Sequence, residues 1–417
     1  MSTSRRVSRR EWLSKAAAAP LVGAAGAASA QAGAGASPPG TPEWMHAPGG
    51  PFLNPPYGQP SKYEKDVVRV LPGGAPNPFP TASRTPLQKL HGIITPNGLH
   101  FERHHAGVPT IDPQRHRLMV HGLVDRPLVL TMDDIVRFPS TSRIHFLECS
   151  GNSTAQFAGP SGRTAQEIHG LLSCAQWTGV RLATVLAEAG VRPQGKWLLA
   201  EGSDAAAMTR SIPMDIAMKD ALLAYAQNGE MLRPEQGYPL RLFLPGIEGN
   251  MNVKWLRRLK VSDKPFHTRE ETSKYTDLMP DGKAVQFTFH MDAKSVILAP
   301  SGGDKLVKGQ FREISGIAWS GHGRIKAVDV SVDGGRNWRE AQLEGPVLEK
   351  ALTRFTLPWR WDGTPLILQS RAIDETGNIQ PTRKVLLDAR GPQYVYHYNA
   401  IQSWRIAADG GVSNVHA

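Results

Sequence analysis

The sequence predicts an α+β chain of two domains, in which a mixed domain of strands and helices precedes an immunoglobulin-like β-sandwich. The chain has 417 residues, of which 40% are hydrophobic, so it can bury two cores of ordinary size. Its 33 prolines and 41 glycines suit many loops and short strands better than a helical bundle or a coiled coil. Helical patterns alternate with short strands up to about residue 283, and strands with turns follow. We therefore expect a first domain at 86–283 and a sandwich at 284–417.

The N-terminus has the pattern of an export signal. Arg9 and Arg10 precede a bulky apolar pair, and an alanine-rich stretch then ends in a small-x-small cleavage site at 28–30. We interpret residues 1–30 as a twin-arginine signal peptide, which implies a periplasmic protein. A membrane anchor and a basic nucleic-acid arm are the alternatives, but the apolar stretch is too short and too weakly hydrophobic to span a bilayer. We expect no membrane span and no nucleic-acid partner.

The cysteine and charge counts exclude several classes of function. With only Cys149 and Cys174, the chain has no covalent haem motif, no thiolate set for an iron–sulfur cluster and no paired-cysteine zinc ribbon. A disulfide between the two cysteines stays open in an oxidising compartment. The formal net charge is +11, and it falls to +7 without residues 1–30, which hold five cations and one carboxylate. That excess favours acidic partners or anionic substrates.

Regular elements are predicted to begin after an extended arm. Residues 31–85 are rich in proline, glycine and alanine, which predicts a segment laid over the surface. A helix is predicted over 181–191, because its apolar residues share one face and Gly190 stands near its end. A second helix is predicted over 221–227, with Asp220 as its cap. Short apolar runs predict strands at 117–120, 144–147, 197–200 and 240–244.

The pattern after about residue 281 is that of a β-sandwich. Residues 327–332 alternate apolar and polar side chains before a turn at 333–335, and 366–373 run into a turn-like segment at 374–378. Short strands with turn signals and almost no helical period are typical of an immunoglobulin-like fold.

The first segment with a candidate for chemistry surrounds Cys149. Residues 145–148 end an apolar strand, and the small polar residues 150–153 follow the cysteine. Such a break presents a side chain at the mouth of a sheet. Taken alone, a cysteine there is more typical of a buried structural residue, and the same interpretation holds for Cys174.

Two further segments are rich in groups that bind anions or metals. Residues 101–109 contain an arginine followed by two adjacent histidines, which are typical of a solvated loop or of a zinc or copper site. Residues 237–255 place Arg241 at the start of an apolar strand, followed by a glycine turn and Lys254. This arrangement suits the binding of a phosphate group.

In this order and spacing, the three segments resemble the sulfite oxidase family of molybdenum-cofactor enzymes. The resemblance covers nearly everything after residue 85, and no single motif decides it. It implies a sulfite-oxidase-type molybdopterin-binding domain followed by a dimerisation sandwich, with molybdenum-molybdopterin as the cofactor and no haem on this chain. The other segments that carry the resemblance are 201–204, 222–229, 274–280, 333–338 and 371–378.

The resemblance also implies roles for particular residues. Cys149 occupies the position of the thiolate that binds molybdenum, and a soft thiolate suits that metal. Tyr275 corresponds to the family's active-site tyrosine and Trp177 to an aromatic side chain lining the pocket, with core packing or a helix cap as the alternatives. Arg103 would face the same pocket, where a guanidinium and a phenol can bind an oxyanion. The residues implied to hold the pterin are Arg103, His104, His105, Cys149, Asp204, Gln236, Arg241, Gly249 and Lys254.

Two of these residues are the candidates for the cofactor's phosphate, namely Arg241 and Lys254. The alternative for Lys254 is a solvated strand end, and the alternative for Asp204 is a turn cap.

Departures from the family pattern bear on the substrate. Sulfite oxidases carry arginines after the ligand cysteine that help to bind sulfite, whereas residues 150–155 of this chain contain none. Gln236 stands where many relatives have histidine, and Lys274 where an acidic residue often precedes the tyrosine. Less positive charge beside the metal suits a bulkier substrate. Segments 148–153 and 271–282 are similar to those of sulfane dehydrogenases.

The expected function is therefore oxidation of sulfane sulfur, carried on a cysteine of a sulfur carrier protein, in periplasmic thiosulfate metabolism. Oxygen would derive from water. Because the chain has no haem motif, the expected electron acceptor is a c-type cytochrome subunit, which joins a homodimer of this chain in a heterotetramer. The alternative within the family is a sulfite dehydrogenase that reduces soluble cytochrome c. A noncatalytic binding protein is the alternative outside it.

Overall fold

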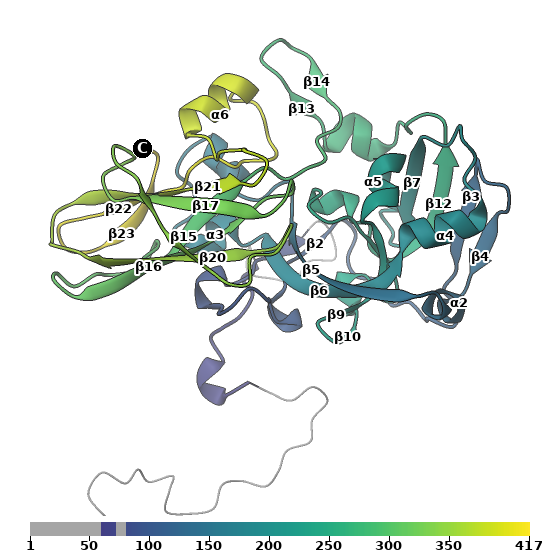
Figure 1. Ribbon diagram of the computed structural model, residues 1–417, viewed down its shortest axis with the longest axis horizontal. Coiled ribbons are helices and arrows are strands. Elements are labelled where there is room, and N and C mark those ends of the chain that lie inside the picture. Colours follow the sequence, from purple (N-terminus) through teal and green to yellow (C-terminus); the bar gives the residue numbers. More distant parts are fainter. Residues whose placement is uncertain (1–59, 72–80) are drawn as a thin grey trace, which may run out of the picture. The chain divides into compact units, whose positions relative to one another are not determined.

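Two five-stranded sheets form the first domain of the computed structural model, which describes residues 60–71 and 81–417 (Figure 1). The predicted signal peptide and most of the predicted arm lie outside the described residues. The first sheet has the order β10 (Glu230–Met231), β9 (Leu222–Gln227), β6 (Leu172–Arg181) and β5 (Ser140–Glu148), with β11 (Arg241–Phe243) paired to β9. The second has the order β4 (Leu128–Leu130), β3 (Leu118–Gly122), β12 (Leu256–Ser262), β7 (Trp197–Gly202) and β8 (Thr209–Pro213).

Short helices and small hairpins complete this domain. The α-helices are α2 (Met132–Arg137), α3 (Ala165–His169), α4 (Leu182–Ala189) and α5 (Met214–Lys219). The 3₁₀ helices are η2 (Lys62–Glu64), η3 (Leu87–Lys89), η4 (Asn97–Leu99), η5 (Thr154–Phe157), η6 (Pro234–Gln236) and η7 (Gly249–Met251), and η8 (Glu270–Lys274) is a π-helix. Two-stranded ladders join β1 (Thr81–Ser83) to β2 (Glu102–His104) and β13 (Asp277–Leu278) to β14 (Ala284–Val285). No helix in this described part of the chain, or in the sandwich, is long and apolar enough to cross a membrane.

The helix predicted over 181–191 is confirmed as α4. Its buried residues include Leu182, Val185 and Leu186, which join the core between α4, α5 and the second sheet. The helix ends at Gly190, whose φ of 70° lies in the left-handed region that glycine adopts without steric cost. The predicted strands at 117–120, 144–147, 197–200 and 240–244 correspond to β3, β5, β7 and β11.

The helix predicted over 221–227 is wrong, because this segment forms strand β9. β9 pairs with β6 on one side and with β10 and β11 on the other, so its short apolar run is buried as a central strand. A run of this length does not distinguish a buried strand from a buried helix. Asp220 caps no helix here; its carboxylate accepts a hydrogen bond from Lys350 Nζ at 3.1 Å.

The second domain is the predicted β-sandwich. One sheet has the order β15 (Lys294–Ala299), β16 (Phe311–Trp319), β20 (Thr353–Arg360) and β19 (Gln342–Glu344). The other has the order β18 (Arg339–Glu340), β17 (Ile325–Ser331), β21 (Leu366–Asp374), β22 (Ser403–Ile406) and β23 (Val412–Val415). The sequence did not predict α6 (Arg383–Arg390), a helix capped by Thr382 with Leu386 as its buried residue.

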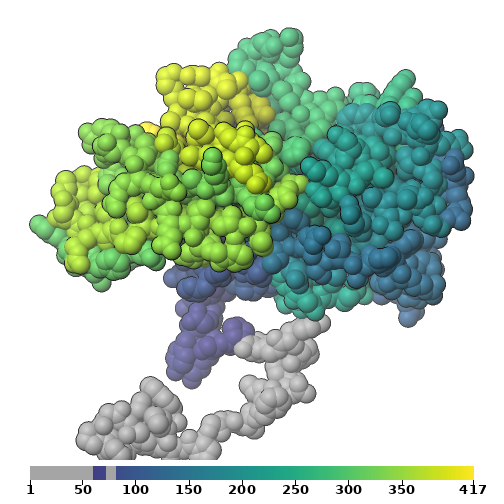
Figure 2. Space-filling view, viewed as in Figure 1, coloured from purple at the N-terminus to yellow at the C-terminus, as the bar shows by residue number. Residues whose placement is uncertain are grey.

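The two domains share a hydrophobic core. Leu87, Phe146 and Cys174 of the first domain pack in one buried cluster with Val296 and Phe355 of the sandwich. Residues Lys62–Ala417 accordingly group as one unit. Figure 2 shows the same contact from outside, where green atoms of the sandwich lie directly against teal atoms of the first domain.

Candidate active site

A cavity of about 650 Å³ opens where several strands and turns of the first domain end. It is lined by residues of β2, the turn after β5, the loop between β7 and β8, the start of β11, and the segment from η7 to β12. Ten of the eleven predicted site residues line it, although they are spread over more than 170 positions of sequence. They are Arg103, His104, His105, Cys149, Asp204, Gln236, Arg241, Gly249, Lys254 and Tyr275.

Trp177 is the predicted site residue that does not line this cavity. Its indole is fully buried and stacks on Phe243 at 4.5 Å between ring centroids. The Arg241 guanidinium lies over the Trp177 ring, 4.9 Å from the indole centroid. Trp177 therefore packs against Arg241 without lining the cavity itself, because β6 places the indole in the core of the first sheet.

Cys149 lies in a tight turn that follows β5. Its N–H donates to Leu171 O at 3.0 Å, and its carbonyl accepts from Asn152 N at 2.8 Å. Gly249 approaches this turn so closely that a Cβ atom there would lie 2.8 Å from Glu148 O and 3.1 Å from Cys149 Cα. Burial raises the pKa of the Cys149 thiol, and the Arg103 charge opposes that shift.

The two cysteines differ in accessibility. Cys149 is partly accessible from the cavity, whereas Cys174 is fully buried in the shared core, where burial raises the pKa of its thiol to about 12. Both are free thiols, so the disulfide that the sequence left open does not form in this structure. Cys174 has the packing role that its sequence context suggested.

The basic cluster, which we define as His104, Gln236, Arg241 and Lys254, lies on the cavity. Arg241 donates to Gln236 O at 3.0 Å and to Asn252 O at 3.1 Å, while its buried Nε has no hydrogen-bond partner. Among the described residues no carboxylate lies within ion-pair distance of it. Burial lowers the pKa of Arg241 to about 9, which leaves the guanidinium charged at neutral pH. An unpaired buried cation on a cavity favours an anionic ligand.

Protein acceptors satisfy more of the hydrogen-bond donors of Lys254 than of Arg241. Its Nζ donates to Arg103 O, His104 Nδ1 and Glu235 O at 2.8 to 3.1 Å, which uses all three of its N–H groups on protein acceptors. Lys254 is therefore not the solvated strand end that was the alternative. Arg241 has free donor capacity toward the cavity, and it is the stronger of the two phosphate candidates.

His104 is fixed by a carboxylate on its other side. Its Nε2 lies 2.5 Å from Glu102 Oε2, so Nε2 carries the proton and Nδ1 accepts from Lys254. Burial alone would raise the pKa of Glu102, but the His104 hydrogen bond and the charge of Arg69 outweigh it and lower that pKa to about 2. Across all described residues, no group of three histidine, cysteine or acidic side chains is arranged to hold a metal ion.

The thiol cluster, which we define as His105, Cys149, Asn250 and Tyr275, lies on the same cavity. The Tyr275 hydroxyl is 2.9 Å from His105 Nε2. Burial raises the pKa of Tyr275 well above its usual value, so the phenol keeps its proton. Burial and then the Arg103 charge lower the pKa of His105 to about 4, so its ring is neutral at pH 7.

A segment of the second domain that the sequence did not indicate reaches this cluster. The Tyr396 ring lies 5.3 Å from the Tyr275 ring, and the backbone N–H groups of Val395 and Tyr396 donate to Asp277 Oδ1. The next residue, His397, donates its backbone N–H to Ser150 O at 2.9 Å. The sandwich domain thus contributes to the surroundings of Cys149 and Tyr275.

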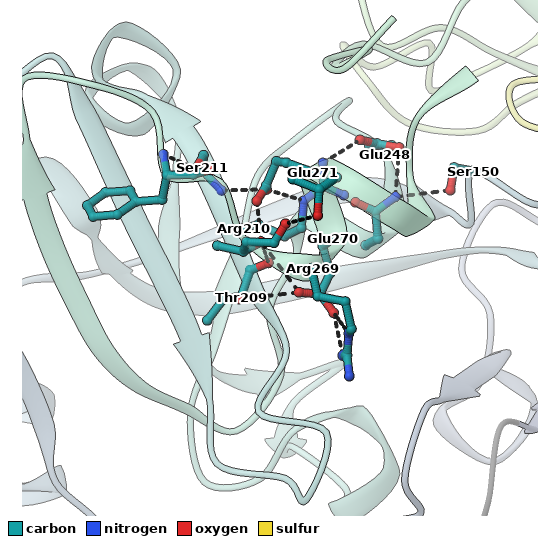
Figure 3. Close-up of polar contacts among 12 residues, drawn as sticks. Ser150, Thr209, Arg210, Ser211, Glu248, Arg269, Glu270 and Glu271 are labelled. Atoms are coloured by element: carbon teal, nitrogen blue, oxygen red, sulfur yellow. Dashed lines mark hydrogen bonds and ion pairs between the residues drawn. The ribbon is translucent and has the colours of Figure 1, made fainter. Parts of the chain in front are cut away.

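A buried polar network links the turn that follows Cys149 to the helix that leads to Tyr275. Figure 3 shows the residues of this network. Arg210 Nε donates to Glu271 Oε1 at 2.9 Å, and its Nη2 lies 3.4 Å from Glu248 Oε1. Asn250 Nδ2 donates to Glu248 Oε2 at 2.7 Å and to Ser150 Oγ at 3.0 Å. Because Glu271 belongs to η8, which leads to Tyr275, and Ser150 follows Cys149, the network joins the two turns that carry these side chains.

None of the network residues was predicted. Charged residues that a fold buries must be paired. Glu148, directly before Cys149 at the end of an apolar strand, is a charged residue that its neighbours would bury, so the sequence does indicate a buried charge beside the cysteine. Arg210 lies between Thr209 and Ser211 and carries no such signal. Asp204 also lines the cavity, and its Oδ1 accepts from Met208 N at 3.4 Å, so it acts as the turn cap that was its alternative.

Comparison with known proteins identifies the family. The model of the oxidoreductase molybdopterin binding domain matches residues 105–270, and that of the Mo-co oxidoreductase dimerisation domain matches residues 285–403. The sulfite oxidase of Gallus gallus is 34% identical over 316 residues, which cover 69% of this chain and 68% of that protein. The chain belongs to the sulfite oxidase family of molybdopterin oxidoreductases.

Other relatives within and near this family show how far the similarity extends. The mitochondrial sulfite oxidase of Mus musculus is 34% identical over 354 residues, 76% of this chain, and this chain spans only 63% of its length. The crystal structure of the sulfane dehydrogenase SoxCD from Paracoccus pantotrophus matches with a TM-score of 0.88 and 48% identity, over 91% of this chain and 98% of that chain. The family's cofactor is molybdenum-molybdopterin.

The residues around the cavity fit this cofactor. Cys149 offers a soft thiol on the cavity, which suits molybdenum as a ligand. The buried and unpartnered Arg241 Nε and Asn250 Oδ1 mark places where a polar ligand would complete hydrogen bonds. Gly249 has no Cβ, which allows its backbone to pack directly against the Cys149 turn at the wall of the cavity. The residues that would hold the cofactor are Cys149 at the metal and the basic cluster at the pterin and its phosphate.

Proposed function

We propose that this chain is the molybdenum subunit of a sulfane dehydrogenase, which oxidises sulfane sulfur bound to a cysteine of a carrier protein. The observation that carries the proposal is the 48% identity to the sulfane dehydrogenase SoxCD over 98% of that chain, against 34% to sulfite oxidases. The absence of arginine from residues 150–155, directly after Cys149, supports it as well.

The bound cofactor would supply two-electron redox chemistry and transfer of water-derived oxygen to sulfur. The chain's own residues position the substrate for this step. The charge of Arg103 opposes the rise in the pKa of the Cys149 thiol, so its guanidinium can also hold a negatively charged sulfur or oxygen atom. Tyr275 keeps its proton and can donate a hydrogen bond to charge that develops on oxygen. His105 orients the Tyr275 hydroxyl at 2.9 Å.

The proposed partners follow from the electron balance. Each oxidation delivers two electrons, and the sequence contains no haem motif to pass them on. We place the chain in a heterotetramer with a c-type cytochrome subunit, built around a homodimer that uses the dimerisation domain. The twin-arginine pattern within residues 1–30 supports a periplasmic location.

The test compares two substrates on the exported and purified chain. A metal and pterin assay should find one molybdenum and one pterin per chain. With the cytochrome subunit present, a sulfane-loaded carrier protein should reduce the cytochrome faster than free sulfite does. Turnover with free sulfite alone would overturn the proposal.

Cys149→Ser is the sharpest variant for the site. We expect it to keep the fold and to lose oxidation, because a hydroxyl is a poor ligand for a soft metal. Circular dichroism checks the fold, and cytochrome reduction measures the activity. The matched control is Cys174→Ser, which alters the fully buried thiol outside the cavity and should leave the molybdenum content unchanged. Unaltered turnover in Cys149→Ser would refute the role of Cys149.

A sulfite dehydrogenase is the second candidate, because sulfite oxidases of several animals are 32 to 34% identical to this chain. It predicts the opposite order of the two substrates in the same assay.

A further inference from the structure

Glu148, directly before Cys149, carries a buried carboxylate that the sandwich domain holds. The residue is 1% exposed. Its Oε1 accepts from Lys294 Nζ at 3.1 Å and from Asn152 Nδ2 at 2.9 Å, and its Oε2 accepts from Trp319 Nε1 at 2.6 Å. Asn152 belongs to the Cys149 turn itself, whereas Lys294 and Trp319 belong to the second domain.

The two sandwich donors are neighbours on adjacent strands. Lys294 begins β15 and Trp319 ends β16, and the two residues face each other in the antiparallel register. Both are buried, and the Lys294 ammonium lies 5.6 Å from the Trp319 ring centroid. They present a cation and an N–H donor together at one edge of the sandwich.

Lys294 also holds the far end of the same turn. Its Nζ donates to Ser153 Oγ at 3.0 Å, and Ser153 has a φ of 67°, in the left-handed region. A non-glycine residue keeps such a conformation only where its surroundings hold it. Lys294 therefore contacts the turn on both sides of Cys149, at Glu148 and at Ser153.

A buried carboxylate without its cation is strongly destabilised, so Glu148 would move toward water if Lys294 were removed. That movement displaces a residue that is covalently joined to Cys149. The other donors, Asn152 and Trp319, are neutral and cannot replace the countercharge.

We propose that the sandwich domain positions the Cys149 thiol, and that Lys294 and Trp319 are the positioning residues, acting through Glu148 and Ser153. The inference depends on Cys149 as the metal ligand, and it is independent of whether the substrate is sulfane sulfur or sulfite. The second domain then has a role in the active site of its own chain, besides dimerisation.

The test compares Lys294→Met with a matched control, Lys350→Met. Lys350 is also a buried sandwich lysine that pairs with a first-domain carboxylate, that of Asp220, but it does not contact the Cys149 turn. Both variants lose one interdomain ion pair. Only the first should change the surroundings of Cys149.

Three measurements on the full chain separate positioning from general stability. The molybdenum content of purified Lys294→Met should fall about tenfold or more, the size typical of removing an outer-shell partner of a metal ligand. The molybdenum electron paramagnetic resonance signal of the remaining loaded protein should shift. In the cofactor-free chain, alkylation of Cys149 should become faster, with the buried Cys174 as the internal reference.

Equal molybdenum contents, resonance signals and alkylation rates in Lys294→Met and Lys350→Met would overturn the proposal. If Lys294→Met does not fold, Trp319→Phe removes one hydrogen bond to Glu148 and keeps an aromatic ring in the core. It should fold and show a smaller shift of the resonance signal, and an unchanged signal would overturn the proposal. The double variant Glu148→Gln with Lys294→Met removes both charges and should recover most of the molybdenum content; no recovery would contradict the role of the ion pair.

Discussion

Two buried arginines in the first domain differ in what neutralises them. Arg210 and Arg241 are each no more than 2% exposed, and each lies near an aromatic ring. Arg210 contacts the carboxylates of Glu248 and Glu271. Arg241 donates only to backbone carbonyls and contacts no carboxylate of the described residues. Each arginine keeps one buried nitrogen without a hydrogen-bond partner, Nη1 in Arg210 and Nε in Arg241.

The difference distinguishes a buried charge that the protein itself neutralises from one that a bound ligand would neutralise. Burying an arginine without a countercharge is strongly unfavourable. Arg210 has two carboxylate partners, so its buried charge needs no ligand. Arg241 lines the cavity and lacks such a partner, which is the arrangement expected for a group that meets the cofactor's phosphate.

The largest effect on stability should come from Arg210→Met. The variant leaves two buried carboxylates without their cation, and we expect it to lower the free energy of unfolding by about 3–5 kcal/mol. Urea unfolding of the cofactor-free chain measures the loss. A loss below about 1 kcal/mol, the size of an exposed ion pair, would contradict the structural role assigned to Arg210.

Arg241→Met should cost less stability and should instead weaken ligand binding. No carboxylate is left unpaired, so the cofactor-free chain should lose less than Arg210→Met does. Loss of a charge-assisted hydrogen bond costs about 1.5–3 kcal/mol, which corresponds to about 10- to 150-fold in affinity. Titration of the cofactor-free chain with pyrophosphate, followed by calorimetry, measures this effect. Equal affinity in wild type and Arg241→Met, or equal weakening in Arg210→Met, would remove the distinction between the two arginines.

The smallest effect should be a change in pH dependence at Lys254. Burial, and then the charge of Arg241, lower the pKa of Lys254 from 10.5 to about 7. Between these values the folded chain binds fewer protons than the unfolded chain, so the stability of the cofactor-free chain rises with pH in this window. Lys254→Met removes the titrating group and should make that rise shallower. Unfolding curves at pH 7, 8 and 9 test it, and parallel curves would contradict the shifted pKa.

Local patterns were sufficient to predict much of the fold. The helix α4 has an apolar face and a terminal glycine within nine residues, and the sandwich strands alternate next to glycine turns. Residues 221–227 could not be predicted in the same way, because pairing with three other strands makes this run a strand. That information lies in the partners of the segment and not in its own residues.

The candidate site shows the same limit. The resemblance to a family led to ten of the residues that line the cavity, since those motifs are contiguous in sequence. Arg210, Lys294 and His397 are isolated residues on elements far from Cys149 in the sequence. Only tertiary contacts bring Lys294 and His397 to its turn, and Arg210 to Glu248 in the network that reaches this turn. Trp177 was expected in the pocket wall, but the side of β6 on which it falls faces the core.

The core that the two domains share has a consequence for heating. Val296 and Phe355 cannot lose their packing without exposing Phe146 and Cys174, so we expect the two domains to unfold together. A calorimetric scan of residues 62–417 should therefore show one endotherm rather than two. Any temperature that loosens the sandwich also dismantles the cavity, and the thermal limit of the enzyme is set as much by its second domain as by its first.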